Sequence, residues 1–488
     1  MLIKRGKKPY QSKPPLLLAL DQGGHSTRAI VFDLTGEIVA RTRVKVGISI
    51  PRSGWVEQDA GELAASLTEV LDQTARLLGP DVSRLSAAGL ATQRSNVVCW
   101  HRETGDALTS AISWQDRRAS PWIRQFAPWS DQVHQITGLY LSAHYGAGKL
   151  RWCLDRSAAV KRALQKGTLA CGPLASFLAW RLLGSRPYLV DPANAARTLL
   201  WSLQRKDWDP QLLDMFAVPR QLLPRCVESD YPFGEIMVGD RPVKLRCLTG
   251  DQSAALFVAG PPEPARALIN LGTGAFVQRA TGERVVYVPG LVSGIALHTA
   301  TSTTYTLEGT VNGAGSALDW LQARQPGLDL LANLDSWLNE VVAPPLFLNG
   351  IAGLGAPWWL ADFESRFIGG GRSRDRAVAV IESIVFLLTV NLQRMAVLEP
   401  PLHSIIVTGG LAVLDGLCQK LADLNEVQVI RPAECEATAR GLAWLLGERR
   451  RPWEPKNAAL FDPRDGGTLQ DRFRHWQHAM ERAMVSAG

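Results

Sequence analysis

The chain has 488 residues, of which 46% are hydrophobic and 20% charged, with a formal net charge of +7. This apolar content is enough for large cores and predicts two or three globular domains. No uninterrupted apolar run reaches the roughly 18 residues that a membrane helix needs. No apolar signal segment follows the basic start, and the basic residues are scattered without a nucleic-acid motif. We therefore expect neither membrane insertion nor a nucleic-acid partner.

The seven cysteines include no Cys-x-x-Cys pair and are odd in number. This usage is typical of free thiols in a reducing compartment rather than of a disulfide framework. The sequence therefore predicts a cytoplasmic protein.

In chain order, a basic tail at residues 1–13 precedes an apolar run at 16–20 that reads as a buried strand. A glycine-rich turn at 21–26 leads to a second strand at 29–32, and a Thr-Gly turn leads to a third at 37–40. The next segment predicts a helix, because Leu63, Leu67, Val70, Leu71 and Leu78 share one helical face behind a capping pair, Asp59 and Glu62.

The opening unit recurs in the second half of the chain. Residues 267–271 read as a strand, 272–274 as a glycine-rich turn, 275–279 as a second strand and 284–288 as a third. The segment Gly-Pro-Pro-Glu-Pro at 260–264 separates the two copies and is typical of an inter-domain linker. We expect an N-terminal domain at 14–259 on the substrate side and a C-terminal domain at 265–488 on the nucleotide side. The alternation of strands and helices indicates the α/β class.

Two glycine-rich turns, one in each half, could present backbone N–H groups to phosphate oxygens, although such turns also simply connect strands. Asp21, beside the first turn, could hold Mg²⁺ or only bond its own turn. Residues 407–410 place two glycines at the end of an apolar strand, where a nucleotide could approach or the chain could merely turn. Asp251 precedes a small-residue helix and could be a helix cap or a general base. Arg94, Gln93 and Trp114 could contact a polyhydroxy carbon skeleton.

These motifs, in their order along the chain, resemble the FGGY carbohydrate kinases, and among them most closely the glycerol kinases. The similarity extends from about residue 16 to about residue 447. The matching stretches are Gly-Trp-Val-Glu-Gln-Asp at 54–59, Trp-Gln-Asp-Arg-Arg at 114–118, Gly-Lys-Leu-Arg-Trp at 148–152, Gly-Asp-Gln-Ser-Ala-Ala-Leu-Phe at 250–257, Gly-Thr-Gly at 272–274, Gly-Leu-Gly-Ala-Pro at 353–357 and Glu-Ser-Ile at 382–384.

The resemblance implies two actin-like (ribonuclease H-like) domains flanking a deep cleft, and ATP-dependent phosphorylation of a small sugar or polyol with Mg²⁺. It implies that Asp251 is the catalytic base. It places the acceptor near Arg94, Trp114, Asp251, Gln252 and Phe276. It places ATP and Mg²⁺ near Asp21, Gly23, Gly24, His25, Arg28, Gly272, Thr273, Gly315, Gly409 and Gly410, with Asp21 on the metal. Members of the family commonly form homo-oligomers.

The sequence also departs from the glycerol kinase pattern. Ser95 stands where a glutamate follows the arginine, and His144 stands where a tyrosine is usual. In the first turn, Gly24 and His25 replace two threonines. With serine in place of glutamate at position 95, a carboxylate that accepts hydrogen bonds from two hydroxyl groups is missing. The pattern therefore supports a different or larger polyol or sugar as acceptor at least as well as glycerol. A non-catalytic or regulatory member that binds nucleotide or polyol is the alternative, and an actin-like or chaperone-like ATPase is a third hypothesis.

Overall fold

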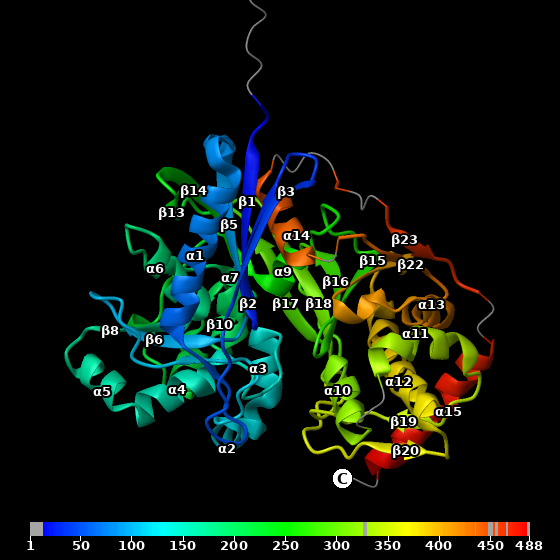
Figure 1. Ribbon diagram of the computed structural model, residues 1–488. Coiled ribbons are helices and arrows are strands. Elements are labelled where there is room, and N and C mark those ends of the chain that lie inside the picture. Colours follow the sequence, from blue (N-terminus) through cyan, green and yellow to red (C-terminus); the bar gives the residue numbers. More distant parts are fainter. Residues whose placement is uncertain are drawn as a thin grey trace, which may run out of the picture.

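The computed structural model describes residues 13–325, 329–434, 436–447, 452–453, 457–464 and 467–485. The basic tail predicted at 1–13 lies, except for Lys13, outside these residues. Two mixed sheets stand side by side at the centre of the molecule, with helices on their outer faces (Figure 1).

The first sheet is built from the N-terminal half of the chain. Its strands follow the order β13 (Gly234–Val238), β14 (Arg241–Gly250), β5 (Leu85–Thr92), β1 (Leu16–Gln22), β2 (Ser26–Phe32) and β3 (Ile38–Lys45). Strands β14, β5 and β1 run parallel, whereas β2 and β3 form the antiparallel extension predicted from the first repeat unit. The carboxyl ends of the three parallel strands therefore meet at one edge of the sheet.

The second sheet comes from the C-terminal half. Its order is β17 (Val292–His298), β18 (Thr303–Val311), β16 (Ala275–Gly282), β15 (Arg266–Leu271), β21 (Ser404–Thr408), β22 (Gln428–Arg431) and β23 (Ala459–Phe461). β15 and β16 are antiparallel, as predicted, and β15 runs parallel to β21.

The prediction of a strand at 284–288 is wrong. Val285–Val288 is outside the sheet, and β18 takes the place beside β16. The segment is held by contacts with the first half of the chain instead: the Tyr287 hydroxyl donates to the Gln135 carbonyl at 2.8 Å, and the Gly290 N–H donates to the Tyr140 hydroxyl at 2.6 Å. These contacts are non-local, so a strand pattern read from local sequence could not reveal them.

Helices cover both sheets. In the first half they are α1 (Ala60–Leu78), α2 (Ser120–Ile123), α3 (Ser130–Thr137), α4 (Gly146–Arg156), α5 (Ala158–Gln165), α6 (Leu174–Leu182), α7 (Pro192–Ala195), α8 (Pro210–Met215) and α9 (Asp251–Ala255). In the second half they are α10 (Gly315–Arg324), α11 (Leu330–Glu340), α12 (Ser373–Arg394), α13 (Asp415–Asn425), α14 (Ala437–Leu446) and α15 (Gly467–Val485). Four small strands, β4 (Glu57–Gln58), β7 (Ala111–Ile112), β6 (Val97–His101) and β8 (Leu169–Pro173), form a side sheet of the first half. The remaining pairs are β9 (Leu189–Val190) with β12 (Arg225–Cys226), β10 (Trp201–Ser202) with β11 (Asp207–Trp208), and β19 (Leu346–Leu348) with β20 (Arg366–Ile368).

Helix α1 forms as the sequence predicts. The Asp59 carboxylate accepts the Glu62 N–H at 2.9 Å, and the leucine face is buried against the first sheet. Burying such a face gives roughly 1.5–3 kcal/mol for each large side chain, which outweighs the helix propensity of the segment.

Two short helices join the halves. α9 and α14 lie between the two sheets (Figure 1), and their apolar side chains form one core with residues of both. Gly441 allows this approach, because a Cβ at this position would lie only 1.9 Å from the Ala254 carbonyl oxygen.

One helix of the described residues, within residues 373–397, is long and apolar enough to cross a membrane, but 89% of its apolar window is buried inside the protein. It is the α12 core helix of the second half, because its side chains pack against β16, β18 and β19 in a single hydrophobic cluster.

Candidate active site

The parallel strands of the first sheet carry three predicted site residues to the same edge. In the paired register Asp21 lies beside Ala91 of β5, which in turn lies beside Thr249 of β14. Arg94 lies two residues after the end of β5, and Asp251 directly follows β14. The structure therefore brings Asp21, Arg94 and Asp251 together from positions far apart in the sequence, as expected for ligands at the carboxyl ends of parallel strands.

Asp251 is the first residue of α9, and Gly250 is its N-cap. Its Oδ1 atom accepts the Gln252 N–H at 2.7 Å and lies 3.9 Å from the Arg94 Nε atom. Burial raises the pKa of Asp251, and Arg94 and the Gln252 N–H partly offset that rise. The side chain nevertheless keeps 24% of its surface exposed. A carboxylate of raised pKa that a substrate hydroxyl can still reach has the properties of a general base.

Glu308 is a site residue that sequence reasoning missed. Arg94 donates to both of its oxygens, from Nη1 at 2.9 Å and from Nη2 at 3.0 Å, and Arg197 pairs with the same carboxylate. Burial alone would raise the pKa of Glu308, but the two arginines outweigh it and hold the pKa at about 2. The available signal was a single acid inside the otherwise uncharged, threonine-rich stretch 303–311, since buried acids are almost always paired.

The acceptor side of the site contains Ser95, Trp114 and His144. The rings of Trp114 and His144 lie 5.5 Å apart, centre to centre. Burial, together with Lys149, Arg117, Arg197 and Arg94, lowers the pKa of His144 well below its usual range, so its imidazole is neutral at pH 7. Ser95 has a φ of 67°, which is uncommon for a residue with a side chain, and its hydroxyl is buried without a hydrogen-bond partner among the described residues.

Lys149 connects two of these residues. Its side chain is fully buried, which lowers the pKa of Lys149 well below its usual range, and its Nζ atom donates to the carbonyl of Ser95 at 2.9 Å and to that of His144 at 2.6 Å. The Lys149 side chain therefore positions the segments that carry two of the departures from the glycerol kinase pattern, Ser95 and His144. In the sequence, Lys149 is distinguished only as part of the matching stretch at 148–152.

The two other predicted acceptor residues come from different halves. Phe276 on β16 pairs with Thr310 of β18, so by strand alternation it lies on the same sheet face as Glu308. Gln252 on α9 accepts a hydrogen bond from the Asn270 amide on β15 at 3.4 Å. Both halves of the chain therefore supply groups to this region.

The first glycine-rich turn is held by a glutamine network. The Gly23 carbonyl accepts from Gln22 at 2.8 Å and from Gln93 at 3.1 Å, and the Gly24 carbonyl accepts from Gln58 at 2.9 Å. In the described part of the chain, the N–H groups of Gly24 and His25 donate to no protein acceptor. The His25 side chain is exposed. Satisfied carbonyls beside free N–H groups are the arrangement that binds an anion.

The second glycine-rich turn, at residues 272–274, likewise combines hydrogen-bonded carbonyls with free N–H groups. The Gly272 carbonyl accepts the Gly315 N–H at 3.0 Å, and the Thr273 carbonyl accepts the Ser316 N–H at 3.0 Å, both from the first turn of α10. The N–H groups of Thr273 and Gly274 have no protein acceptor among the described residues. Gly315 permits this contact, because a Cβ there would lie 2.9 Å from the Gly272 oxygen.

Gly409 and Gly410 end β21 beside this second turn. Gly409 has a φ of 93°, and a Cβ there would lie 2.4 Å from the Leu271 carbonyl oxygen. Gly410 faces open space. The structure thus brings Gly272, Thr273, Gly315 and the two glycines to one edge of the second sheet.

Asp21 is the residue expected to hold a metal. Arg28 donates to its Oδ2 atom at 3.2 Å and to Glu436 at 2.9 Å. Burial raises the pKa of Asp21 to about 7; Arg28 opposes the rise, whereas Asp251 and Glu436 add to it. A cation would relieve this repulsion, so the residues fit Mg²⁺. Among the described residues no three metal-binding side chains converge, which suits an ion that takes one or two carboxylates and completes its shell with phosphate and water.

Comparison with known proteins shows what this arrangement belongs to. The FGGY family of carbohydrate kinases matches twice, with its N-terminal domain at residues 16–255 and its C-terminal domain at 267–447. A glycerol kinase of Alkalilimnicola ehrlichii is 35% identical, over 96% of this chain and 98% of the relative. One of Acinetobacter baylyi is 34% identical, with the same shares.

Solved structures share the fold. The crystal structure of Plasmodium falciparum glycerol kinase with ADP superposes with a TM-score of 0.86 at 24% identity, covering 96% of this chain and 98% of that one. A xylulose kinase from Rhodospirillum rubrum has a TM-score of 0.84 at 19% identity, covering 96% and 99%. The expected pair of actin-like domains is thereby confirmed. The chain belongs to the FGGY family of carbohydrate kinases and is an ATP-dependent kinase of a sugar or polyol.

Proposed function

We propose that the chain phosphorylates a hydroxyl of a polyol or ketose larger than glycerol, with Asp251 as the base. The observation that carries this proposal is the buried, unpartnered hydroxyl of Ser95 beside Arg94, at the position where the glycerol kinase pattern has a glutamate. A serine is shorter by two chain atoms and uncharged. It therefore leaves room for a longer carbon chain and takes away a strong acceptor for the hydroxyls of glycerol.

In this proposal Asp251 accepts the proton of the attacking hydroxyl, and Arg94, 3.9 Å from its carboxylate, orients the acceptor. Trp114 offers a flat apolar face to the carbon chain, and neutral His144 can donate to or accept from a hydroxyl. Phe276 and Gln252 close the site from the other side.

The free N–H groups of the two glycine-rich turns would hold the phosphates of ATP, one turn from each half of the chain. Mg²⁺, when bound near Asp21, would neutralise phosphate charge during transfer. The ADP in the Plasmodium falciparum relative supports a nucleotide in this fold. Removal of divalent cations with EDTA should abolish turnover, and added Mg²⁺ should restore it. We also propose a cytoplasmic location, because all six cysteines in the described ranges are free thiols.

The test is a coupled ADP-release assay with MgATP across glycerol, four- to six-carbon polyols, ketoses and sugar acids. We expect kcat/KM for one of the longer acceptors to exceed that for glycerol by ~10-fold or more, equivalent to about one lost charged hydrogen bond. A kcat/KM highest for glycerol would overturn the proposed acceptor class.

A variant that restores the glutamate of the glycerol kinase pattern tests the same proposal from the opposite direction. Ser95→Glu should raise kcat/KM for glycerol and lower it for the longer acceptor. Ser95→Gln is the matched control, because glutamine has the length of glutamate without its charge and meets the same positive φ. Equal gains in both variants would show that length rather than charge controls the choice of acceptor.

A further inference from the structure

A cavity lies in the N-terminal half, and none of its lining residues is among those assigned above to the acceptor or the nucleotide. Its volume is about 590 Å³, within the range of roughly 300–1,000 Å³ typical of small-molecule sites. Three segments form its walls: the loop before β4, the stretch that contains α2, and helix α4.

The walls combine three tryptophans with charged side chains. Trp55, Trp122 and Trp152 line the cavity and are half-buried. The rings of Trp55 and Trp152 meet edge to face at 5.2 Å, and the Arg118 guanidinium lies 4.0 Å from the first ring centre and 4.7 Å from the second. Such a surface favours a flat ring.

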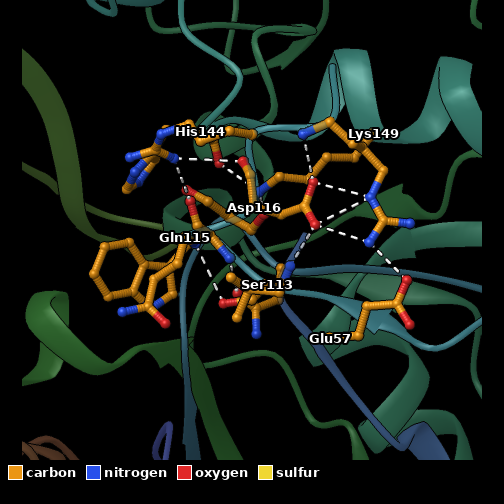
Figure 2. A network of polar contacts seen from close by, with 12 residues as sticks. Glu57, Ser113, Gln115, Asp116, His144 and Lys149 are labelled. Carbon is orange, nitrogen blue, oxygen red and sulfur yellow. Dashed lines mark hydrogen bonds and ion pairs between the residues drawn. The ribbon is translucent and has the colours of Figure 1, made fainter. Parts of the chain in front are cut away.

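Arg118 also lines the cavity, but two acids already balance its charge. Its side chain is only 1% exposed and donates to Glu57 at 2.6 Å and to Asp116 at 2.8 Å (Figure 2). Arg151 likewise pairs with Asp155. Arg52 and Arg156 also line the cavity and are exposed, and neither forms an ion pair with any residue that the structure describes. The Arg52 guanidinium lies 5.0 Å from the centre of the Trp55 ring, and Arg156 helps to lower the pKa of Asp155. The cavity therefore carries exposed positive charge beside its tryptophan side chains, since four arginines and one acid, Asp155, line it.

We infer that this cavity is a binding site for a small aromatic anion, a flat ring carrying a carboxylate, sulfonate or phosphate. The tryptophans stack on the ring, and Arg52 and Arg156 bind the anionic group. Arginine is suited to this task, because its planar donors match such groups.

The same three segments extend to the acceptor site. The Asp116 carboxylate that binds Arg118 also accepts the Val56 N–H at 2.7 Å, and it follows Trp114 by two residues. Lys149, next to Gly148 of the cavity wall, donates to the carbonyls of Ser95 and His144. Figure 2 shows Asp116, His144 and Lys149 within this one polar network. A ligand that orders these walls therefore orders the acceptor site and lowers the KM for the acceptor, and by linkage the acceptor tightens the ligand.

The binding test uses 8-anilinonaphthalene-1-sulfonate, a fluorescent aromatic sulfonate, titrated into the full chain with saturating MgADP so that the nucleotide site is filled. We expect saturable binding that weakens ~10-fold or more in the double variant Arg52→Ala/Arg156→Ala, as loss of a charged contact predicts. The matched control is Arg246→Ala/Arg324→Ala, which removes two exposed arginines elsewhere, one of them stacked on Trp320. Equal affinity in the two double variants would overturn the site.

The coupling test measures the acceptor KM with and without the saturating probe. The expected result is at least a twofold lower KM in the unmodified chain and no change in Arg52→Ala/Arg156→Ala. An unchanged KM in the unmodified chain would overturn the coupling. Failure of glycerol or of any other acceptor in the specificity panel would leave the binding result unaffected, so the two proposals fail separately.

Discussion

The contacts of Asp251 fit both of its candidate roles, helix cap and catalytic base. As the first residue of α9 it accepts a backbone N–H, as a capping carboxylate does, and it also faces Arg94 with part of its surface exposed. Burial disfavours its charged form, while the arginine favours it. The sequence could identify the residue but not choose between cap and base, since that choice depends on what lies across from it.

Replacing Asp251 by asparagine tests the base assignment. Asparagine keeps the size of the side chain but cannot take a proton, so we expect kcat to fall by roughly 10²–10⁴-fold with little change in Tm. Asp240→Asn, on an exposed turn, is the control and should match the unmodified chain. Near-normal turnover of Asp251→Asn, measured by ADP release, would remove the assignment.

At the scale of elements, the two glycine-rich turns repeat one design with different supports. Side chains of Gln22, Gln58 and Gln93 hold the first turn, whereas the backbone of α10 holds the second. The repeat and its glycines were predictable from sequence. Apart from Gln22, which is adjacent in sequence, the supports were not, because they come from segments about 30 to 70 residues away that only the fold brings close.

Gly315→Val tests the second turn. The new side chain would press on the Gly272 carbonyl and move the free N–H groups, so we expect the Kd for ADP to rise by ~10-fold or more. Isothermal titration calorimetry measures this change. Gly370→Val is the control, because a Cβ at Gly370 meets open space. An unchanged Kd for ADP in Gly315→Val would argue against the turn as a phosphate site.

At the scale of the whole molecule, polar contacts join the two halves at the site itself. Glu308 of the second sheet binds Arg94 and Arg197 of the first half, Glu436 binds Arg28, and Asn270 binds Gln252. The α9–α14 core lies behind them. The acceptor site and the contact between the halves therefore share the same residues, so changes at one should affect the other.

The ion pairs of Glu308 with Arg94 and Arg197 should make the free energy of unfolding depend on pH in a specific direction. The folded pKa of about 2 lies below the unfolded value of about 4.3, so this group stabilises the fold above the unfolded pKa, and the contribution is lost as pH falls toward 2. This contribution of Glu308 to the free energy of unfolding is about 3 kcal/mol. In Glu308→Gln, the free energy of unfolding should be lower at pH 7 and should fall less steeply between about pH 5 and pH 3.

Urea unfolding at several pH values measures this dependence. Glu263→Gln is the control, since Glu263 is half exposed and its ion pairs with Arg266 and His403 are long, at 3.8 and 3.6 Å. Such a surface pair contributes about 0–1 kcal/mol, so its removal should leave the pH profile unchanged. Equal pH profiles for Glu308→Gln and the unmodified chain would contradict the ion-pair account.

Sequence alone determined the duplicated α/β architecture, the glycine-rich turns, helix α1, and Asp21, Arg94 and Asp251 as candidates, because these depend on local periodicity, turn chemistry and motif order. Tertiary structure decided the rest. It placed β18 rather than residues 284–288 beside β16, brought Glu308 and Lys149 into the candidate site, and left Arg52 and Arg156, at a cavity lined by tryptophans, without an ion pair among the described residues. The physical reason is that the stability of a buried charge, and the binding capacity of an unpaired one, depend on neighbours that are distant in sequence and close only in the folded chain.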